Sequence, residues 1–245
     1  MNLDFNSKSP LSKAMNGVID ESLEKQNKKQ TPRTYLGGSR LGVECERALQ
    51  FEYFNTPKDE GKDFPGRVLR IFRRGHWAED YLIECINDAG FDLRTEKPNS
   101  KEQYGFSVMQ DKIQGHCDGV FLDGKGIFET PALWECKCIQ EKDFNILKRE
   151  GVQKKYPVYY GQMQVYQAYL QLTEHPAIFT AISANTMSIY WELVPFNPQA
   201  AQELSDKGVK IIQACENGEL LPKMSNDPAS YKCKWCSWCD RCHNL

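Results

Sequence analysis

The chain has 245 residues, of which 40% are hydrophobic and 26% are charged, and these values are typical of a folded domain with a substantial core. They exclude a peptide hormone and a small disulfide scaffold. The formal net charge is −2, so the whole molecule has no long-range attraction to an anionic polymer, and nucleic-acid binding would depend on local charge. Acidic residues outnumber basic ones in 75–140, whereas basic residues are in excess in 1–74 and in 141–160.

The first predicted element is an amphipathic helix over 9–25, with Ser9 as its cap and Pro10 in its first turn. A polar linker follows, so we expect residues 1–33 to form an N-terminal helix and linker, and 34–245 to form a single domain. The helix places its apolar side chains on one face: Leu11, Met15, Val18, Ile19 and Leu23.

The middle of the chain predicts a helix followed by short strands. The helix covers 66–89 and ends at Gly90, a residue type common just after a helix. A hairpin turn is expected at Asp123-Gly124. The predicted strands are 91–95, 105–109, 113–122 and 127–138.

The C-terminal half predicts a helix over 158–172, a hairpin of strands 177–184 and 188–194, and a helix over 198–216 before a cysteine-rich tail. Helices and strands therefore alternate in blocks along the chain. This order indicates an α/β (α+β) fold in which helices cover a mixed sheet.

Ionisable residues interrupt two of the apolar strands. Asp118 lies within the strand predicted over 113–122, and Glu135 and Lys137 lie two residues apart, on one face of the next. Buried charges are costly unless they neutralise one another or hold a cation. Hard oxygen ligands favour Mg²⁺ or Mn²⁺, which lower the pKa of a bound water, so the pattern predicts metal-assisted hydrolysis of a phosphodiester.

Asp118 followed by Glu135-Cys136-Lys137 resembles the core motif of the PD-(D/E)xK nuclease superfamily. The resemblance implies a restriction-endonuclease-like mixed central sheet flanked by helices. It also implies that Asp118, Glu135 and the backbone carbonyl of Cys136 hold one or two divalent ions, while Lys137 positions the attacking water.

Two helical motifs strengthen this resemblance. The segment 73–79 (RRGHWAE) is similar to the first motif of the RecB-like and YqaJ-like or lambda-exonuclease-like branches, which implies that His76 or Glu79 joins the metal ligands. Gln162 and Tyr166 match the QxxxY motif of the same branches. One helical turn separates them, so both can orient the site or contact the scissile strand.

Ten cysteines in a chain without a secretory signal or an apolar run of 18 residues indicate reduced thiols and metal binding rather than disulfides. We therefore expect a cytoplasmic protein of a bacterial or virus-infected cell, with no membrane association. Cys233, Cys236, Cys239 and Cys242 follow one another at intervals of three. Four ligands so close together crowd one zinc ion, so a [4Fe-4S] cluster with Cys45 as a remote ligand is favoured over Zn²⁺.

Cys45 followed by Cys233-x2-Cys236-x5-Cys242 resembles the iron-sulfur arrangement of AddB-type and CRISPR-adaptation exonucleases. The resemblance implies a cluster that joins the two ends of the domain, including the tail 227–245. Cys239 is an alternative to Cys242, because three cysteines at intervals of three plus one remote cysteine hold the clusters of bacterial ferredoxins.

The sequence thus predicts a divalent-metal-dependent DNA exonuclease that acts on ends or single strands with little sequence specificity, in viral or mobile-element recombination or repair, together with a recombination protein partner. A catalytically silent iron-sulfur or zinc DNA-binding subunit and an RNA-processing nuclease of the same fold are the alternatives. Endonuclease activity, the polarity of degradation and the oligomeric state stay open. The basic residues near the motifs that we expect to contact phosphates are Arg67, Arg70, Arg73, Arg74, Lys142, Lys148, Arg149, Lys154 and Lys155. Tyr156, Tyr159 and Tyr160 either stack on unpaired bases or pack within the protein. Contact of Ser39, Arg40 and Arg47 with a DNA end is a further hypothesis.

Overall fold

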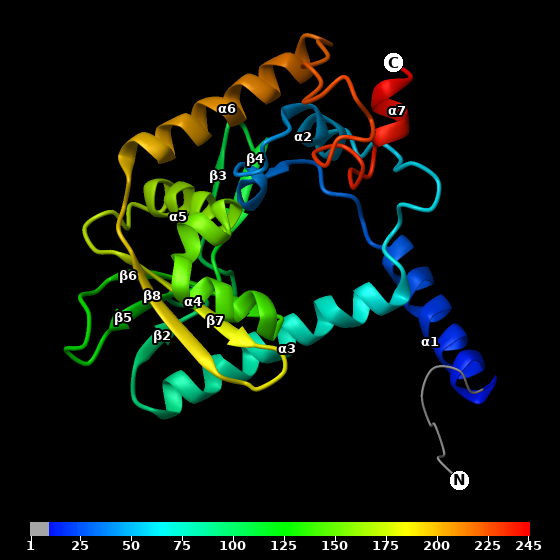
Figure 1. Ribbon diagram of the computed structural model, residues 1–245. Helices are drawn as coiled ribbons and strands as arrows, with labels where there is room; N and C mark the ends of the chain where they lie inside the picture. Colours follow the sequence, from blue (N-terminus) through cyan, green and yellow to red (C-terminus); the bar gives the residue numbers. More distant parts are fainter. Residues whose placement is uncertain (1–9) are drawn as a thin grey trace.

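The structure is a computed structural model that describes residues 10–245, and it combines helices with two β-sheets (Figure 1). The helices are α1 (Pro10–Lys28), the 3-10 turn η1 (Gly38–Arg40), α2 (Glu46–Tyr53), α3 (Gly66–Asp88), α4 (Glu141–Lys155), α5 (Pro157–Tyr169), α6 (Pro198–Glu216) and α7 (Cys239–His243). The strands are β1 (Leu36–Gly37), β2 (Asp92–Arg94), β3 (Gly105–Val108), β4 (Ile113–His116), β5 (Gly119–Asp123), β6 (Ala132–Ile139), β7 (Ala177–Ser183) and β8 (Ile189–Val194).

The larger sheet has the order β2-β5-β6-β7-β8, and β6 and β7 are its one parallel pair, so the sheet is mixed as predicted. The smaller sheet has the order β1-β4-β3. The predicted single strand 113–122 is wrong, because β4 belongs to the smaller sheet and β5 to the larger one. The chain crosses between the sheets at Cys117 and Asp118, where the Cys117 N–H donates to the carbonyl of Tyr104 (2.9 Å) instead of to a strand partner.

The central strand β6 is buried on both faces of the sheet, and its side chains alternate between two apolar clusters. Trp134 and Cys136 pack toward α3 with Leu82, while Leu133 packs on the other side. The alternation places Glu135 on the face opposite Cys136. The Trp134 indole N–H donates to the Thr180 hydroxyl at 2.9 Å, which satisfies a polar group in the core.

Helix α1 extends to Lys28, three residues beyond its predicted end, and contacts α3 through polar groups. The Glu24 carboxylate accepts from the Gly66 N–H at 2.8 Å, and Arg70 forms an ion pair with Asp20. A Cβ at Gly66 would lie 2.4 Å from the Asp20 Cα, so this close approach requires glycine. The expected apolar face does not pack against the domain, and four of its side chains are 44–71% exposed: Leu11, Met15, Val18 and Ile19.

The helices predicted over 66–89, 158–172 and 198–216 are present as α3, α5 and α6. Helix α6 begins where the Asn197 side chain accepts from the Ala200 N–H at 3.0 Å. Helices α2 and α4 were not predicted. The sequence of α4 is strongly charged and contains Gly151 at φ 75°, so it lacks the long apolar periodicity that reveals a helix.

The C-terminal tail folds back on α2 and on the connection between α2 and α3 (Figure 1). The Trp238 ring lies 5.8 Å from that of Phe51, and its N–H donates to the carbonyl of Thr56 at 2.9 Å. The Asp59 carboxylate accepts the backbone N–H groups of Asp240 (2.7 Å) and Arg241 (3.2 Å) at the start of α7. Segments that are far apart in sequence thus meet around the cysteines.

Replacing Asp59 by alanine is expected to lower the free energy of unfolding by about 1 kcal/mol, because two N–H groups at the start of α7 lose their acceptor. Chemical denaturation of the purified chain measures this change. Asp206→Ala is the matched control, since that carboxylate accepts from the side chain of Gln202 on an exposed surface of α6. Equal stabilities of the Asp59→Ala variant and the parent would show that Asp59 does not hold the tail.

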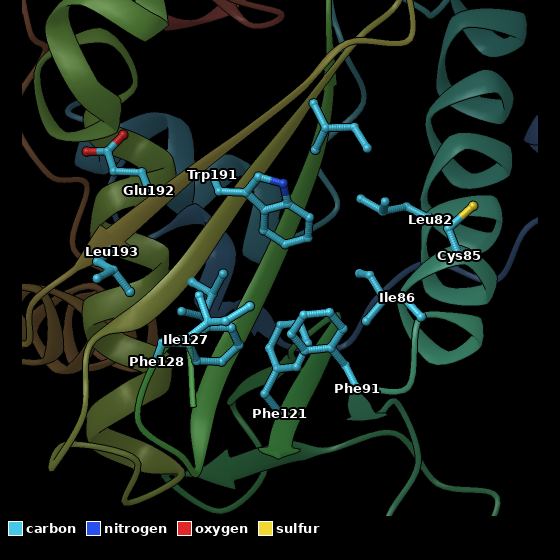
Figure 2. A pocket seen from close by; sticks show the side chains of 13 residues that line it. Leu82, Cys85, Ile86, Phe91, Phe121, Ile127, Phe128, Trp191, Glu192 and Leu193 are labelled. Atoms are coloured by element: carbon cyan, nitrogen blue, oxygen red, sulfur yellow. The ribbon is translucent and has the colours of Figure 1, made fainter. Parts of the chain in front are cut away.

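An apolar pocket of about 530 Å³ lies between α3 and the outer face of β8 (Figure 2). Leu82 and Ile86 of α3 point into it from one side, and Trp191 of β8 points into it from the other. None of the predicted catalytic side chains lines this pocket. No helix within residues 10–245 is long and apolar enough to cross a lipid bilayer.

Candidate active site

Asp118, Glu135 and Lys137 meet at the point where the chain passes from β4 to β5 beside β6. The Asp118 carboxylate accepts from the Cys136 N–H at 2.8 Å and from the Lys137 ammonium at 3.4 Å. The same ammonium donates to Glu135 Oε1 and, at 2.9 Å, to the backbone carbonyl of Cys136. The Lys137 ammonium therefore lies within hydrogen-bond reach of the other three groups predicted from the motif.

The three ionisable side chains differ in their exposure to solvent. Glu135 is fully buried, whereas the side chains of Asp118 and Lys137 are 18% and 24% exposed, so a substrate can approach from the side of these two. Gln162 and Lys137 both donate to Glu135 Oε1, but the buried Oε2 has no hydrogen-bond partner among the described residues. An unpartnered buried carboxylate oxygen is costly, and a cation beside it would remove that cost.

The charges at the site shift its pKa values strongly. Burial, followed by the nearby charge of Asp118, raises the pKa of Glu135 from 4.5 to about 8. Burial by itself would lower the pKa of Lys137, but the charges of Asp118 and Glu135 outweigh it and raise that pKa well above its ordinary value. The lysine thus keeps its positive charge beside Asp118 and Glu135.

Of the two predicted ligands on α3, Glu79 is close to this group and His76 is not in contact with it. Burial and then the charge of Asp118 raise the pKa of Glu79 from 4.5 to about 7, while Lys137 lowers it. The side chain of His76 is exposed, and no hydrogen bond or ion pair joins it to another described residue. The electrostatic interaction of Glu79 with Asp118 and Lys137, together with the exposure of His76, therefore favours Glu79 as the residue that α3 contributes.

Helix α5 places Gln162 and Tyr166 beside the acidic side chains. Gln162 is 6% exposed, and its amide donates to Glu135 Oε1 at 2.8 Å. Tyr166 is buried, with a pKa raised by burial and by the charge of Glu135, and its hydroxyl is hydrogen-bonded to Ser39. In this arrangement Gln162 contacts the catalytic group directly, whereas Tyr166 connects α5 to η1.

Tyr159 is a further site residue whose position the motif alone did not reveal. Its ring centroid lies 5.5 Å from the Lys137 ammonium, and its ring stacks on that of Phe179 at 6.5 Å. A signal was present in the sequence, because Tyr159 precedes Gln162 by three residues and Tyr166 by seven, and such spacings share one helix face.

The oxygen donors of Asp118, Glu135, Glu79 and the Cys136 carbonyl suit a hard divalent cation such as Mg²⁺ or Mn²⁺. Within the described part of the chain, however, no three His, Cys, Asp or Glu side chains are already spaced so that they could hold one ion together. The Lys137 ammonium instead occupies the centre of the group. The buried, unpartnered Glu135 Oε2 is the feature that fits a cation.

The cysteines predicted to hold a cluster gather between the start of α2 and the tail. Cys45 immediately precedes α2, and the charges of Cys45 and Cys242 act, after burial, to raise the pKa of Cys233. Burial and the charges of Cys45, Cys239 and Cys242 likewise raise the pKa of Cys236. The fold therefore brings the remote cysteine to the tail, although the thiols are not at metal-ligand spacing.

Hydrogen bonds distinguish Cys242 from Cys239. The Cys242 sulfur accepts from the Arg47 guanidinium at 3.6 Å, and the Cys236 sulfur accepts from the Trp238 N–H at 3.5 Å. The Cys239 thiol instead donates to the carbonyl of Pro228 at 3.5 Å, which requires a protonated sulfur. Arg47 is 7% exposed and also donates to the carbonyl of Leu221, so it is not available for the DNA contact that the sequence suggested.

Without a metal ion, the raised pKa of Glu135 is expected to make the protein less stable as pH rises. The folded state keeps the Glu135 proton up to about pH 8, while the unfolded carboxyl loses it near pH 4.5, so the free energy of unfolding falls between these values. Relative to a Glu135→Gln variant, the parent should lose about 1 kcal/mol per pH unit in this window. Urea denaturation in EDTA at several pH values measures the difference.

Glu102→Gln serves as the control in that series, because Glu102 is 76% exposed and pairs only with Lys97 on the surface. Its stability should follow that of the parent at every pH. Parallel curves for the parent and the Glu135→Gln variant would contradict a raised pKa at Glu135.

The sequence matches no protein-family model and is similar to no curated protein. Among solved structures, the fold is similar to an alkaline exonuclease (LHK-Exo) from Laribacter hongkongensis, with a TM-score of 0.53 and 15% identity over 81% of this chain and 93% of that one. LHK-Exo in complex with dAMP aligns with a TM-score of 0.47 and 11% identity over 75% of this chain and 89% of that one. SSO0001 aligns with a TM-score of 0.47 and 13% identity over 95% and 96% of the two chains.

At such identities the similarity establishes the fold alone. A mixed sheet flanked by helices is common to this chain and to the exonuclease fold, so the predicted restriction-endonuclease-like architecture is confirmed. The chain thus has the fold of a known exonuclease, with Asp118, Glu135 and Lys137 grouped beside its central strand.

Proposed function

We propose that this chain is a divalent-metal-dependent nuclease that hydrolyses phosphodiester bonds in DNA, acting as an exonuclease at ends or on single strands. The observation that carries the proposal is the contact of the Lys137 ammonium with both Asp118 and Glu135, next to a buried carboxylate oxygen without a partner. The similarity in fold to an alkaline exonuclease supports the same activity. A role in recombination or repair of viral or mobile-element type, with a recombination protein as partner, remains part of this proposal.

Each residue has a distinct task in the proposed reaction. Asp118, Glu135, the Cys136 carbonyl and Glu79 or His76 would hold Mg²⁺ or Mn²⁺, which polarises the phosphate and lowers the pKa of a water molecule. Lys137 orients the attacking water and stabilises the negative charge that develops on the phosphate oxygens. Gln162 holds Glu135 by its Oε1, which leaves Oε2 free to face the ion.

Digestion of end-labelled single- and double-stranded DNA tests this function, in Mg²⁺, in Mn²⁺ and in EDTA. We expect shortening of the labelled strand with either ion and none in EDTA, and the position of the label gives the polarity of degradation. An RNA strand of the same sequence and a circular DNA complete the comparison, because faster RNA cleavage would favour an RNA-processing nuclease and cleavage of the circle an endonuclease. Binding of DNA without cleavage in either ion would favour a catalytically silent subunit.

We further propose that Cys45, Cys233, Cys236 and Cys242 hold a [4Fe-4S] cluster. Arg47 supports this assignment, because its guanidinium is buried and is hydrogen-bonded to two backbone carbonyls and the Cys242 sulfur, while no carboxylate within residues 10–245 forms an ion pair with it. A buried cation of this kind requires a nearby negative charge, which metal-bound thiolates supply. Hydrogen bonds to two of the sulfurs also fit cluster ligation.

Anaerobic purification tests the cluster directly. The protein should be brown, with broad absorption in the blue region and about four iron atoms per chain. A colourless protein with one zinc ion per chain would replace the cluster by the zinc alternative. Loss of folding after removal of either metal would show that the metal stabilises the tail.

A further inference from the structure

A wide cleft of about 880 Å³ lies between the N-terminal segment 32–64 and the cysteine tail. Its walls come from the chain around β1 and η1, from α2, from the connection between α2 and α3, and from the turn between Cys233 and Cys236. The cleft is lined by four basic residues and one acidic residue. It is thus an electropositive depression in a chain whose net charge is −2.

Aromatic rings and cations are paired in and beside this cleft. Arg33 lies 5.8 Å from the centroid of the Tyr35 ring, and Lys58 lies 3.8 Å from that of Phe64. At its rim, Trp235 is 80% exposed, with Lys234 at 5.4 Å from its ring. An exposed indole beside cations offers a surface on which an unpaired base can stack.

The charges in the cleft differ in how far they are already neutralised. Arg40 forms an ion pair with Glu52 at 2.6 Å, and Lys232 forms one with Glu44 at 3.3 Å. Arg33 and Lys58 form no ion pair within residues 10–245. Instead, Arg33 lies over the Tyr35 ring and Lys58 over the Phe64 ring. These two cations are therefore free to bind phosphate groups.

The cleft leads to the candidate active site through η1. Gly37 and Arg40 line the cleft, and Gly38 between them lies against α5, since a Cβ at Gly38 would be 3.0 Å from the Tyr166 ring. In the same turn, Ser39 is hydrogen-bonded to Tyr166 on α5. A strand lying in the cleft would therefore pass over η1 toward the catalytic carboxylates.

We propose that this cleft binds the single-stranded part of the DNA substrate next to the scissile phosphate, an inference that rests on the proposed nuclease function. Phosphates contact Arg33 and Lys58, and unpaired bases stack on Trp235, Phe64 and Tyr35. The bases of a duplex are already paired and stacked on one another, so these exposed rings select a single strand. The turn that carries Trp235 is bounded by two of the proposed cluster ligands, Cys233 and Cys236, so the cluster would hold this ring in place.

Fluorescence anisotropy with a labelled oligo-dT strand tests the inference on the full-length protein in EDTA, where no hydrolysis occurs. Trp235→Ala should weaken binding about tenfold, because one base loses its stacking surface, and Trp235→Phe should restore most of the affinity. Arg33→Ala with Lys58→Ala should reduce the slope of log affinity against log salt by about 1.4, which corresponds to two phosphates of a single strand. Blunt duplex DNA should bind these variants and the parent within about twofold.

Two controls match these variants in residue type. Trp191→Ala removes another exposed tryptophan, from the apolar pocket beside α3, and Lys97→Ala removes a surface cation outside the cleft. Both should bind oligo-dT like the parent. Parent-like affinity in the cleft variants would overturn the inference, and so would an equal loss of duplex and single-strand binding.

Cleavage assays separate this inference from the proposed function. If the parent cleaves single-stranded DNA and the cleft variants show a raised KM at unchanged kcat, both hold. If the parent cleaves and the variants keep both KM and affinity, the cleft assignment fails and the nuclease assignment stands. If the parent does not cleave but the variants lose affinity, the nuclease assignment fails and the cleft remains a single-strand binding site.

Discussion

Glu135→Gln is expected to reduce metal-dependent DNA cleavage by about a thousandfold or more while leaving the protein folded. The glutamine keeps the shape of the side chain and can still accept from Gln162, as Glu135 Oε1 does at 2.8 Å. It removes the negative charge of the buried carboxylate, whose unpartnered Oε2 is the oxygen best placed to face a cation. Loss of one charged group that stabilises the reacting centre has effects of this order.

Lys137→Met should reduce cleavage by about a hundredfold to ten-thousandfold, because the variant lacks the ammonium that contacts both carboxylates. Initial rates under single-turnover conditions measure both effects. Glu102→Gln and Lys97→Met make the same chemical changes in an exposed surface pair and should retain the parent rate. Cleavage by the Glu135→Gln or Lys137→Met protein at the parent rate would remove these residues from the catalytic group.

The second large effect is expected at the cysteine tail, where Cys242→Ser should abolish the cluster and Cys239→Ser should keep it. The Cys242 sulfur accepts a hydrogen bond from the buried Arg47, as a metal-bound sulfur can. The Cys239 thiol donates a hydrogen bond to the carbonyl of Pro228, which a metal-bound thiolate cannot do. Because metal binding contributes to folding, losing the cluster should lower Tm by about 10–20 °C.

Absorbance, iron content and thermal denaturation of the two variants, purified anaerobically, make this comparison. Cys85→Ser is the matched control, because Cys85 is an exposed thiol on α3 outside the tail. It should retain both the colour and the Tm of the parent. Full iron content in the Cys242→Ser protein together with its loss in the Cys239→Ser protein would reverse the ligand assignment.

Local sequence patterns were sufficient to predict the helices that have strong apolar periodicity or clear end signals. Helix α6 has the predicted bounds 198–216, because a proline and an asparagine cap mark its start and its apolar residues recur at helical spacing. Helix α3 likewise ends before Gly90, which has φ 84°. The prediction failed for 113–122, where an apolar run looks the same whether it stays in one sheet or crosses to another.

The candidate site likewise combines features that the sequence predicts with features that depend on packing. The spacing of Glu135 and Lys137 was sufficient to predict that both lie on one strand face, and the structure agrees. The sequence left His76 and Glu79 equivalent, since residues three apart on a helix can approach the same place. The packing of α3 against the sheet favours Glu79, because Glu79 is partly buried and interacts with the charge of Asp118 while His76 is exposed.

By itself, the sequence determined the chemical groups and the mixed architecture, because these follow from residue types and short-range periodicity. The tertiary structure decided which groups share one environment. The isolation of Glu135 Oε2, the burial of Arg47 beside Cys242 and the cleft around Trp235 all depend on segments far apart in the chain. Burial and long-range contact depend on how the whole chain packs, so short stretches of sequence do not predict them.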